Sequence, residues 1–170
     1  MKLTPFHLAI PVHDIELCRK FYKDILGCIE GRSDKDWVDF NFFGHQLVIH
    51  YQEKSGNLEN VNQVDGKSVP IPHFGLVLEW DTFTNFAKNL KAKGIKFVIE
   101  PYIRFEGQAG EQATMFFKDP SGNALEFKSF KDHDQIFSAE AMDWRMACCN
   151  DDDASKELRQ KYSCIRNHHG

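Results

Sequence analysis

The sequence predicts an α+β fold in which a β-α-β-β-β unit occurs twice. Two observations support this: the order of strand and helix patterns in residues 4–52 recurs in residues 71–130, and each copy opens with a strand that carries a histidine, His7 or His73, opposite its apolar face. Each unit is expected to form a curved sheet with its helix on one side. The two sheets together are expected to make a cupped mixed sheet around a cleft.

The first copy begins with an expected strand over residues 5–12, followed by a helix. Apolar residues alternate along the strand, which leaves His7 on the other face. Asp14 is a suitable N-cap, apolar residues recur at four-residue steps within residues 15–26, and Gly27 stands where a C-cap glycine belongs. Three further strands are expected over residues 28–33, 36–42 and 46–52.

A polar stretch separates this copy from the next. Residues 53–69 have no consistent period and are expected to form a connecting loop. The pattern then restarts with a strand over residues 71–80, a helix capped by Asp81 or Thr82, and Gly94 at the end of that helix. The remaining strands are expected over residues 96–104, 112–117 and 123–129.

The last expected strand carries a carboxylate on its outer face. Turn-forming residues at 119–123 precede it, and the period-two pattern that follows places Glu126 opposite the large apolar side chains. His7, His73 and Glu126 thus all point away from the helices. Two imidazoles and one carboxylate suit a divalent metal with three open positions, most typically Fe(II), although Mn(II), Ni(II) and Zn(II) accept the same ligands.

The composition and net charge indicate which kinds of binding partner and which compartment to expect. A net charge of −4, from 21 Lys and Arg against 25 Asp and Glu, favours a small-molecule substrate over nucleic acid or an anionic membrane. Patterned sequence begins at the amino terminus, with no secretory leader and no apolar run of membrane-spanning length. Five cysteines without a CxxC pair indicate free thiols in a reducing compartment. We therefore expect a cytoplasmic protein.

The expected domain ends near residue 130. Residues 131–170 continue beyond the repeat as a carboxy-terminal extension, which is expected to be partly helical or disordered. Its candidate helices lie within residues 135–146 and 154–162. A docking or dimer-stabilising role is compatible with such an extension.

Four motifs occur in order along the two copies: Phe6-His7-Leu8-Ala9, Phe21-Tyr22-Lys23-Asp24-Ile25-Leu26-Gly27, Pro72-His73-Phe74-Gly75 and Phe117-Lys118-Asp119-Pro120-Ser121-Gly122-Asn123-Ala124-Leu125-Glu126. Together they resemble the vicinal oxygen chelate superfamily, which includes glyoxalase I, extradiol dioxygenases, fosfomycin resistance proteins, methylmalonyl-CoA epimerase and bleomycin resistance proteins. The resemblance covers about residues 4–130 and implies paired modules around a metal cleft. It also implies metal ligands at the positions of His7, His73 and Glu126.

In the superfamily that the sequence resembles, the type of reaction depends on whether the first module supplies a fourth metal ligand. Glyoxalase-like members carry a carboxylate, and epimerases a glutamine, on the last strand of the first module. Here that strand, residues 45–51, contains no Asp or Glu. The remaining set resembles that of extradiol dioxygenases, in which Fe(II) binds both oxygens of a catecholate and leaves room for dioxygen. We therefore expect a ring-cleaving dioxygenase for a small catechol-like substrate, with His50 as an acid, a base or a hydrogen-bond partner beside the metal.

Other roles stay open at this point. His50 or Gln46 as a fourth ligand would favour a glyoxalase- or epimerase-like lyase or isomerase, and Gln46 is also a candidate substrate-binding residue. Tyr102 and Arg104 share one strand face, where Tyr102 is a candidate catalytic residue and Arg104 a candidate contact for an anionic substrate. A non-catalytic binding or resistance protein is a second alternative. A homodimer is compatible with the sequence, which does not decide whether the two modules pair within one chain or across two.

Overall fold

The computed structural model describes residues 4–53, 60–64, 66–108 and 110–137. The first module contains β1 (His7–Val12), α1 (Ile15–Lys20), the π-helical turn η1 (Phe21–Ile25), β2 (Ile29–Asp34), β3 (Trp37–Phe42) and β4 (His45–Tyr51). The second contains β7 (His73–Val77), α2 (Trp80–Ala92), β8 (Phe97–Arg104), β9 (Gln112–Lys118) and β10 (Ala124–Phe130). Strands β5 (Asn60–Val64) and β6 (Lys67–Ile71) lie between the modules, and a 3-10 turn, η2 (His133–Phe137), follows the second.

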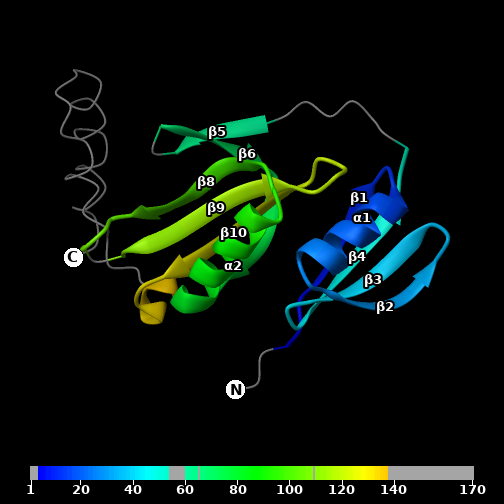
Figure 1. Ribbon diagram of the computed structural model, residues 1–170, viewed down its shortest axis with the longest axis horizontal. Coiled ribbons are helices and arrows are strands. Elements are labelled where there is room, and N and C mark those ends of the chain that lie inside the picture. The colour runs from blue at the N-terminus through cyan, green and yellow to red at the C-terminus, as the bar shows by residue number, and fades with distance from the viewer. Residues whose placement is uncertain (1–3, 54–59, 65, 109, 138–170) are drawn as a thin grey trace, which may run out of the picture. The chain divides into compact units, whose positions relative to one another are not determined.

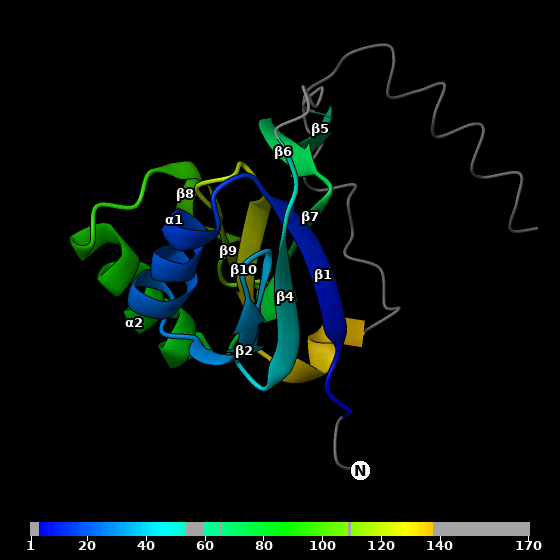
Figure 2. The same cartoon turned by 90° about the vertical axis from the view of Figure 1, so that its right-hand side faces the viewer.

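The two modules have the same topology, which confirms the predicted α+β fold with a repeated unit (Figure 1). The strand order is β1-β4-β3-β2 in the first sheet and β7-β10-β9-β8 in the second. In each sheet the first and last strands of the module pair in parallel, and the other neighbours are antiparallel. Strands β1 and β7, which carry the two histidines, therefore lie at sheet edges, as Figure 2 shows for β1 beside β4.

Three sequence expectations need correction. Residues 53–69 are not simply a loop, because β5 and β6 form an antiparallel hairpin there. Every residue of β5 is exposed, so burial imposes no apolar alternation that could have revealed it. The strand expected over residues 71–80 is β7, which ends at Val77, and α2 starts at Trp80 with Glu79 as its N-cap. The first expected helix is divided into α1 and η1.

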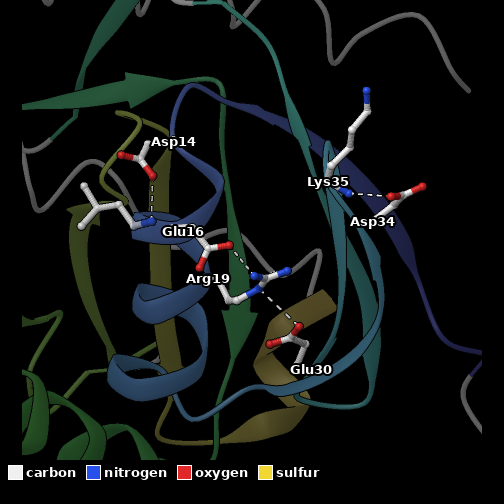
Figure 3. Close-up of polar contacts among 7 residues, drawn as sticks. Asp14, Glu16, Arg19, Glu30, Asp34 and Lys35 are labelled. Carbon is white, nitrogen blue, oxygen red and sulfur yellow. Dashed lines mark hydrogen bonds and ion pairs between the residues drawn. The ribbon is translucent and has the colours of Figure 1, made fainter.

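Helix α1 begins at the predicted cap and is tied to its own sheet (Figure 3). The Asp14 carboxylate accepts a hydrogen bond from the Leu17 backbone N–H at 2.8 Å, which satisfies one of the unpaired donors of the first turn. Arg19 lies between two carboxylates, pairing with Glu16 on the helix and, at 3.3 Å, with Glu30 on β2. The ion pair between Arg19 and Glu30 thereby links helix α1 to strand β2 of the same module.

Both modules turn their apolar faces toward one core. Aromatic rings meet across the module boundary, with centroid distances of 6.0 Å for Phe42 and Phe74, 6.1 Å for Phe42 and Phe127, and 6.3 Å for Phe21 and Phe117. The buried cluster draws residues from the strands and helices of both modules. Because these faces are used within the chain, the opposite faces of the two sheets, which carry the polar residues, lie outside this core.

A buried carboxylate also joins the modules. Asp119, which is 4% exposed, precedes β10, and its Oδ2 accepts a hydrogen bond from the Tyr22 hydroxyl of the first module at 2.9 Å. Its Oδ1 accepts from the backbone N–H groups of Ser121 and Asn123. Burial, followed by the charge and hydrogen bond of Asp119, raises the pKa of Tyr22 well above its ordinary value, so the phenol stays a donor.

Among the described cysteines, Cys18 and Cys28 are buried free thiols. Burial raises the pKa of the Cys18 thiol to about 11 and that of Cys28 to about 12, so both stay protonated near neutral pH. In the described part of the chain, no helix has the length and apolarity needed to cross a membrane. The helices expected in the extension lie outside the described residues, apart from the start of the first, where η2 ends at Phe137.

Replacing Tyr22 by phenylalanine tests the link between the modules. Tyr22→Phe removes a donor from a buried carboxylate and should lower the free energy of unfolding by about 1–3 kcal/mol, measured by urea titration of the metal-free protein. Tyr51→Phe is the matched control, because Tyr51 is 52% exposed, and should change stability by less than about 0.5 kcal/mol. Equal losses in the two variants would contradict a stabilising role for the Tyr22–Asp119 bond.

Candidate metal site

Glu126 stands in the middle of β10, on the face opposite the shared core. Its side chain is 14% exposed and is contacted from three sides. The Thr114 hydroxyl on β9 donates to Oε1 at 2.8 Å, and the Lys128 ammonium lies 3.1 Å from the same oxygen. The second oxygen, Oε2, lies 3.1 Å from Nε2 of His73. The carboxylate is therefore held in place, with one oxygen turned to an imidazole.

His73 is oriented by the backbone of the neighbouring hairpin. Its Nδ1 lies 2.7 Å from the carbonyl oxygen of Pro70 on β6. Since a carbonyl only accepts, Nδ1 carries a proton, and the other ring nitrogen, Nε2, faces Glu126. The ring also contacts Phe116 edge-on, with centroids 5.2 Å apart. A lone pair facing a carboxylate is favourable only with a proton or another cation beside both atoms.

The spacing of these two atoms suits a metal ion. Two ligands in adjacent positions on a metal, with bonds of about 2.1 Å, lie about 3.0 Å apart. The Nε2–Oε2 distance between His73 and Glu126 is 3.1 Å. Metal-bound histidines typically donate their other N–H to a carbonyl or carboxylate, as His73 does to Pro70. The donor set therefore fits two ligands of a divalent metal site.

Gly75 allows β7 and β10 to approach closely enough for this pair. Glu126 is paired with Gly75, and His73 with Ala124, in the parallel register of the two strands. A Cβ atom at position 75 would stand 1.6 Å from the backbone carbonyl oxygen of Glu126. No side chain can be accommodated there without moving one strand away from the other. The glycine therefore serves the geometry of the pair itself.

The third predicted ligand, His7, lies in the other sheet. Its Nδ1 is 2.8 Å from Oε1 of Gln46, the residue with which it is paired across β1 and β4. Within the described ranges, no three His, Cys, Asp or Glu side chains are grouped so that they could hold a metal. The structure thus brings His73 and Glu126 together but does not bring His7 to them.

The other predicted site residues are divided between the sheets. Gln46 and His50 lie on β4, on the same face as His7. On β8, Tyr102 is opposite Thr114, in the row next to Glu126, and the Lys67 ammonium lies 4.7 Å from its ring centroid. Arg104 follows at the end of β8, 5.0 Å from the ring of Phe105. Each sheet thus carries one part of the predicted set.

The repeat allows the two modules to be compared position by position. His7 is paired with Gln46, and His73 is paired with Ala124. Val48, two residues after Gln46, therefore corresponds to Glu126, two residues after Ala124. Valine has no donor atom for a metal. The first module thus lacks a carboxylate where the second has its candidate ligand, Glu126.

Sequence reasoning missed the residues that surround the ligands. Asp39 on β3 is 8% exposed and accepts hydrogen bonds from Arg32 and from the Gln46 side chain. An acidic residue between apolar neighbours in a strand was an available signal. Lys128 lies two residues after Glu126, so period-two alternation also places it on this face. The contact of Pro70 with His73 had no comparable signal, because it depends on a hairpin that was not predicted.

The model of the Glyoxalase/Bleomycin resistance protein/Dioxygenase superfamily matches residues 4–127, and the chain belongs to this superfamily. No curated protein matches the chain. A solved glyoxalase/bleomycin resistance protein/dioxygenase from Alicyclobacillus acidocaldarius is 35% identical, with a TM-score of 0.67 over 79% of this chain and 96% of that one.

Two more distant structures share the fold. A fosfomycin resistance protein from Listeria monocytogenes is 17% identical, with a TM-score of 0.58 over 79% of this chain and 98% of that one. A lactoylglutathione lyase from Agrobacterium tumefaciens is 14% identical, with a TM-score of 0.53 over 74% of this chain and 92% of that one. At these identities the likeness concerns the fold alone.

Replacing Gly75 by alanine tests the close approach of the strands. Gly75→Ala places a methyl group against backbone and should lower the free energy of unfolding by about 3 kcal/mol, measured by urea titration. Gly31→Ala is the control in the other sheet, since a Cβ there would lie 3.4 Å from Cβ of Asp39, and should change stability by less than about 1 kcal/mol. Similar stabilities for Gly75→Ala and the wild type would contradict the steric requirement.

Proposed function

We propose that this protein is a divalent-metal-dependent enzyme that acts on a small molecule with two neighbouring oxygen atoms. The observation that carries the proposal is the pairing of His73 Nε2 with Glu126 Oε2 at 3.1 Å, with the imidazole proton held on the other nitrogen by Pro70. A metal bound there would act as a Lewis acid for the substrate oxygens. Thr114 and Lys128 would keep the carboxylate oriented through its other oxygen.

The third ligand in this proposal comes from a second copy of the chain. His7 lies on the edge strand β1, while His73 lies on the edge strand β7, and these strands have no partner on their outer sides among the described residues. A second copy that places its β1 beside β7 would bring His7 to His73 and Glu126. Twofold symmetry would then create two equivalent sites in a homodimer.

The reaction that we favour is ring cleavage of a small catechol-like substrate by an extradiol-type dioxygenase that uses Fe(II). Its support is the three-ligand set, since Val48 occupies the position that corresponds to Glu126. Three open positions suit a substrate that binds through two oxygens together with dioxygen. His50 would accompany His7 to the site as an acid or base, and Tyr102 and Arg104 would contact the substrate from the second sheet.

A lyase or isomerase of the glyoxalase or epimerase type is the alternative, with His50 as the fourth ligand. His50 is exposed and lies on the same face as His7. Gln46 suits this role less well, because its oxygen faces His7 and its nitrogen faces Asp39. In both reactions the two histidines and Glu126 hold the metal.

Metal content and oxygen uptake separate these possibilities. After anaerobic loading with Fe(II), we expect about one metal per chain by elemental analysis, and oxygen consumption that depends on an added catechol. His7→Ala, His73→Ala and Glu126→Ala should each abolish metal binding with the fold retained, whereas His133→Ala, a histidine outside the site, should not. Bound metal without oxygen uptake would favour the lyase or isomerase. Absence of metal binding in the wild type would overturn the enzyme proposal and favour a non-catalytic binding protein.

Mixing two inactive variants tests whether the site is shared between chains. Neither His7→Ala nor Glu126→Ala can form a complete site alone. Unfolded together and refolded as a mixture, they should recover about a quarter of the wild-type metal sites, because half of the dimers are mixed and each mixed dimer contains one intact site. Each variant refolded alone is the control. No recovery in a mixture that is folded and dimeric would contradict a shared site.

A further inference from the structure

We infer that Asp39 and Gln46 act as positioning residues that place the proton of His7 on Nδ1 and leave Nε2 free to bind a metal. The arrangement is a hydrogen-bonded chain that runs from β3 through β4 to β1. Its importance for metal binding rests on the proposed function. The proton position itself is a property of the metal-free protein.

The series of hydrogen bonds starts at the Asp39 carboxylate, which acts only as an acceptor. Oδ2 of Asp39 accepts from Nε of Arg32 at 3.2 Å and from its Nη2 at 3.1 Å. The same oxygen lies 3.4 Å from Nε2 of Gln46. A carboxylate paired with a guanidinium cannot donate, so Gln46 must turn its NH₂ group to Asp39. The side-chain oxygen of Gln46 consequently faces the other way.

That oxygen determines the tautomer of His7. Oε1 of Gln46 lies 2.8 Å from Nδ1 of His7 and can only accept. Nδ1 therefore donates, and in the neutral ring the lone pair is on Nε2. An unconstrained imidazole in water prefers its proton on Nε2, the atom that a metal would need. The contact with Gln46 thus reverses the ordinary preference of an exposed histidine.

The second module reaches the same result by a different contact. His73 donates from Nδ1 to the Pro70 carbonyl, which is a backbone group. His7 has a side-chain amide in that place, and an amide can turn around. Asp39 prevents this rotation, because the reversed amide would direct its oxygen at a carboxylate. The extra residue is thus needed only where the acceptor is a side chain.

The sheet itself does not require an acid at this position. In the register of the repeat, Asp39 is opposite Val48, and Phe116 is opposite Glu126. Asp39 therefore corresponds to a phenylalanine in the second module. An apolar residue is compatible with this place in the fold, whereas a buried carboxylate is costly unless it is well paired. Asp39 is paired with Arg32, and through Gln46 it is also connected to His7.

Nitrogen-15 NMR of the histidine rings tests the inference in metal-free protein at about pH 9, well above the pKa of a free imidazole. The wild type should show His7 with its proton on Nδ1, the signal being identified by its loss in His7→Ala. Gln46→Leu removes the acceptor and should move the proton mainly to Nε2. Gln46→Glu combined with Asp39→Asn keeps an oxygen acceptor for His7 without placing two carboxylates side by side, and should retain the wild-type tautomer. His73 should be unchanged in both variants and is the internal control.

The Asp39→Ala variant distinguishes the contribution of Asp39 to the His7 tautomer from that of Gln46. Gln46 is then free to turn, and His7 should populate both tautomers. A wild-type His7 with its proton on Nε2 would overturn the inference, as would a Gln46→Leu spectrum identical to that of the wild type. An Asp39→Ala spectrum identical to that of the wild type would show that Asp39 does not position the proton of His7.

Metal affinity, measured by competition with a chelator, gives a second readout. Gln46→Leu should weaken Zn²⁺ binding about 10–100-fold, and Gln46→Glu combined with Asp39→Asn should restore most of the loss. Unchanged Zn²⁺ affinity in Gln46→Leu would overturn the importance of the contact for the site. A wild type that binds no Zn²⁺, Mn²⁺ or Fe²⁺ but has the expected tautomer would overturn the proposed function and leave the inference on His7 intact.

Discussion

The geometry of the candidate site depends on a carboxylate outside it, Asp119. Its two oxygens accept hydrogen bonds from the Tyr22 hydroxyl, from two backbone N–H groups of its own turn and from the Asn123 side chain. Asn123 in turn donates to the carbonyl of Pro11 in the first module. Strand β10 begins at the next residue, so this turn fixes the point from which its alternation starts. A slip of one residue would turn Glu126 into the core.

The shared core explains why His7 lies apart from His73 and Glu126 within one chain. Each sheet has one apolar face, and these faces are buried together inside the chain. The polar faces and the edge strands β1 and β7 remain outside, where an unpaired edge is open to another chain. Folding of the chain thus uses the apolar faces of the two sheets, whereas completion of the proposed site would use their polar faces and edge strands. The proposed dimer would therefore complete the site without changing the core.

Local patterns were sufficient to predict the repeat, most strand positions and the outward direction of Glu126. Strand alternation and helix periodicity are set by near neighbours and can be read from one segment at a time. The packing of one module against the other is not local, since the same apolar faces are compatible with pairing within a chain or between chains. The exposed hairpin had no burial pattern to read. The roles of Asp39 and Pro70 depend on contacts between strands whose register the sequence does not state.

The two modules share a backbone plan but differ in the side chains that would surround a metal. Val48 corresponds to Glu126, and Asp39 corresponds to Phe116, so the carboxylate in each sheet occupies a different row and has a different task. In the proposed site Glu126 would offer an oxygen to the metal, whereas Asp39 would act only through Gln46. Val48 has no donor atom, so it would add no ligand from the first sheet in the proposed dimer. His50 lies on the same face of that sheet as His7 and would accompany it to the site, where an imidazole can act as an acid or a base.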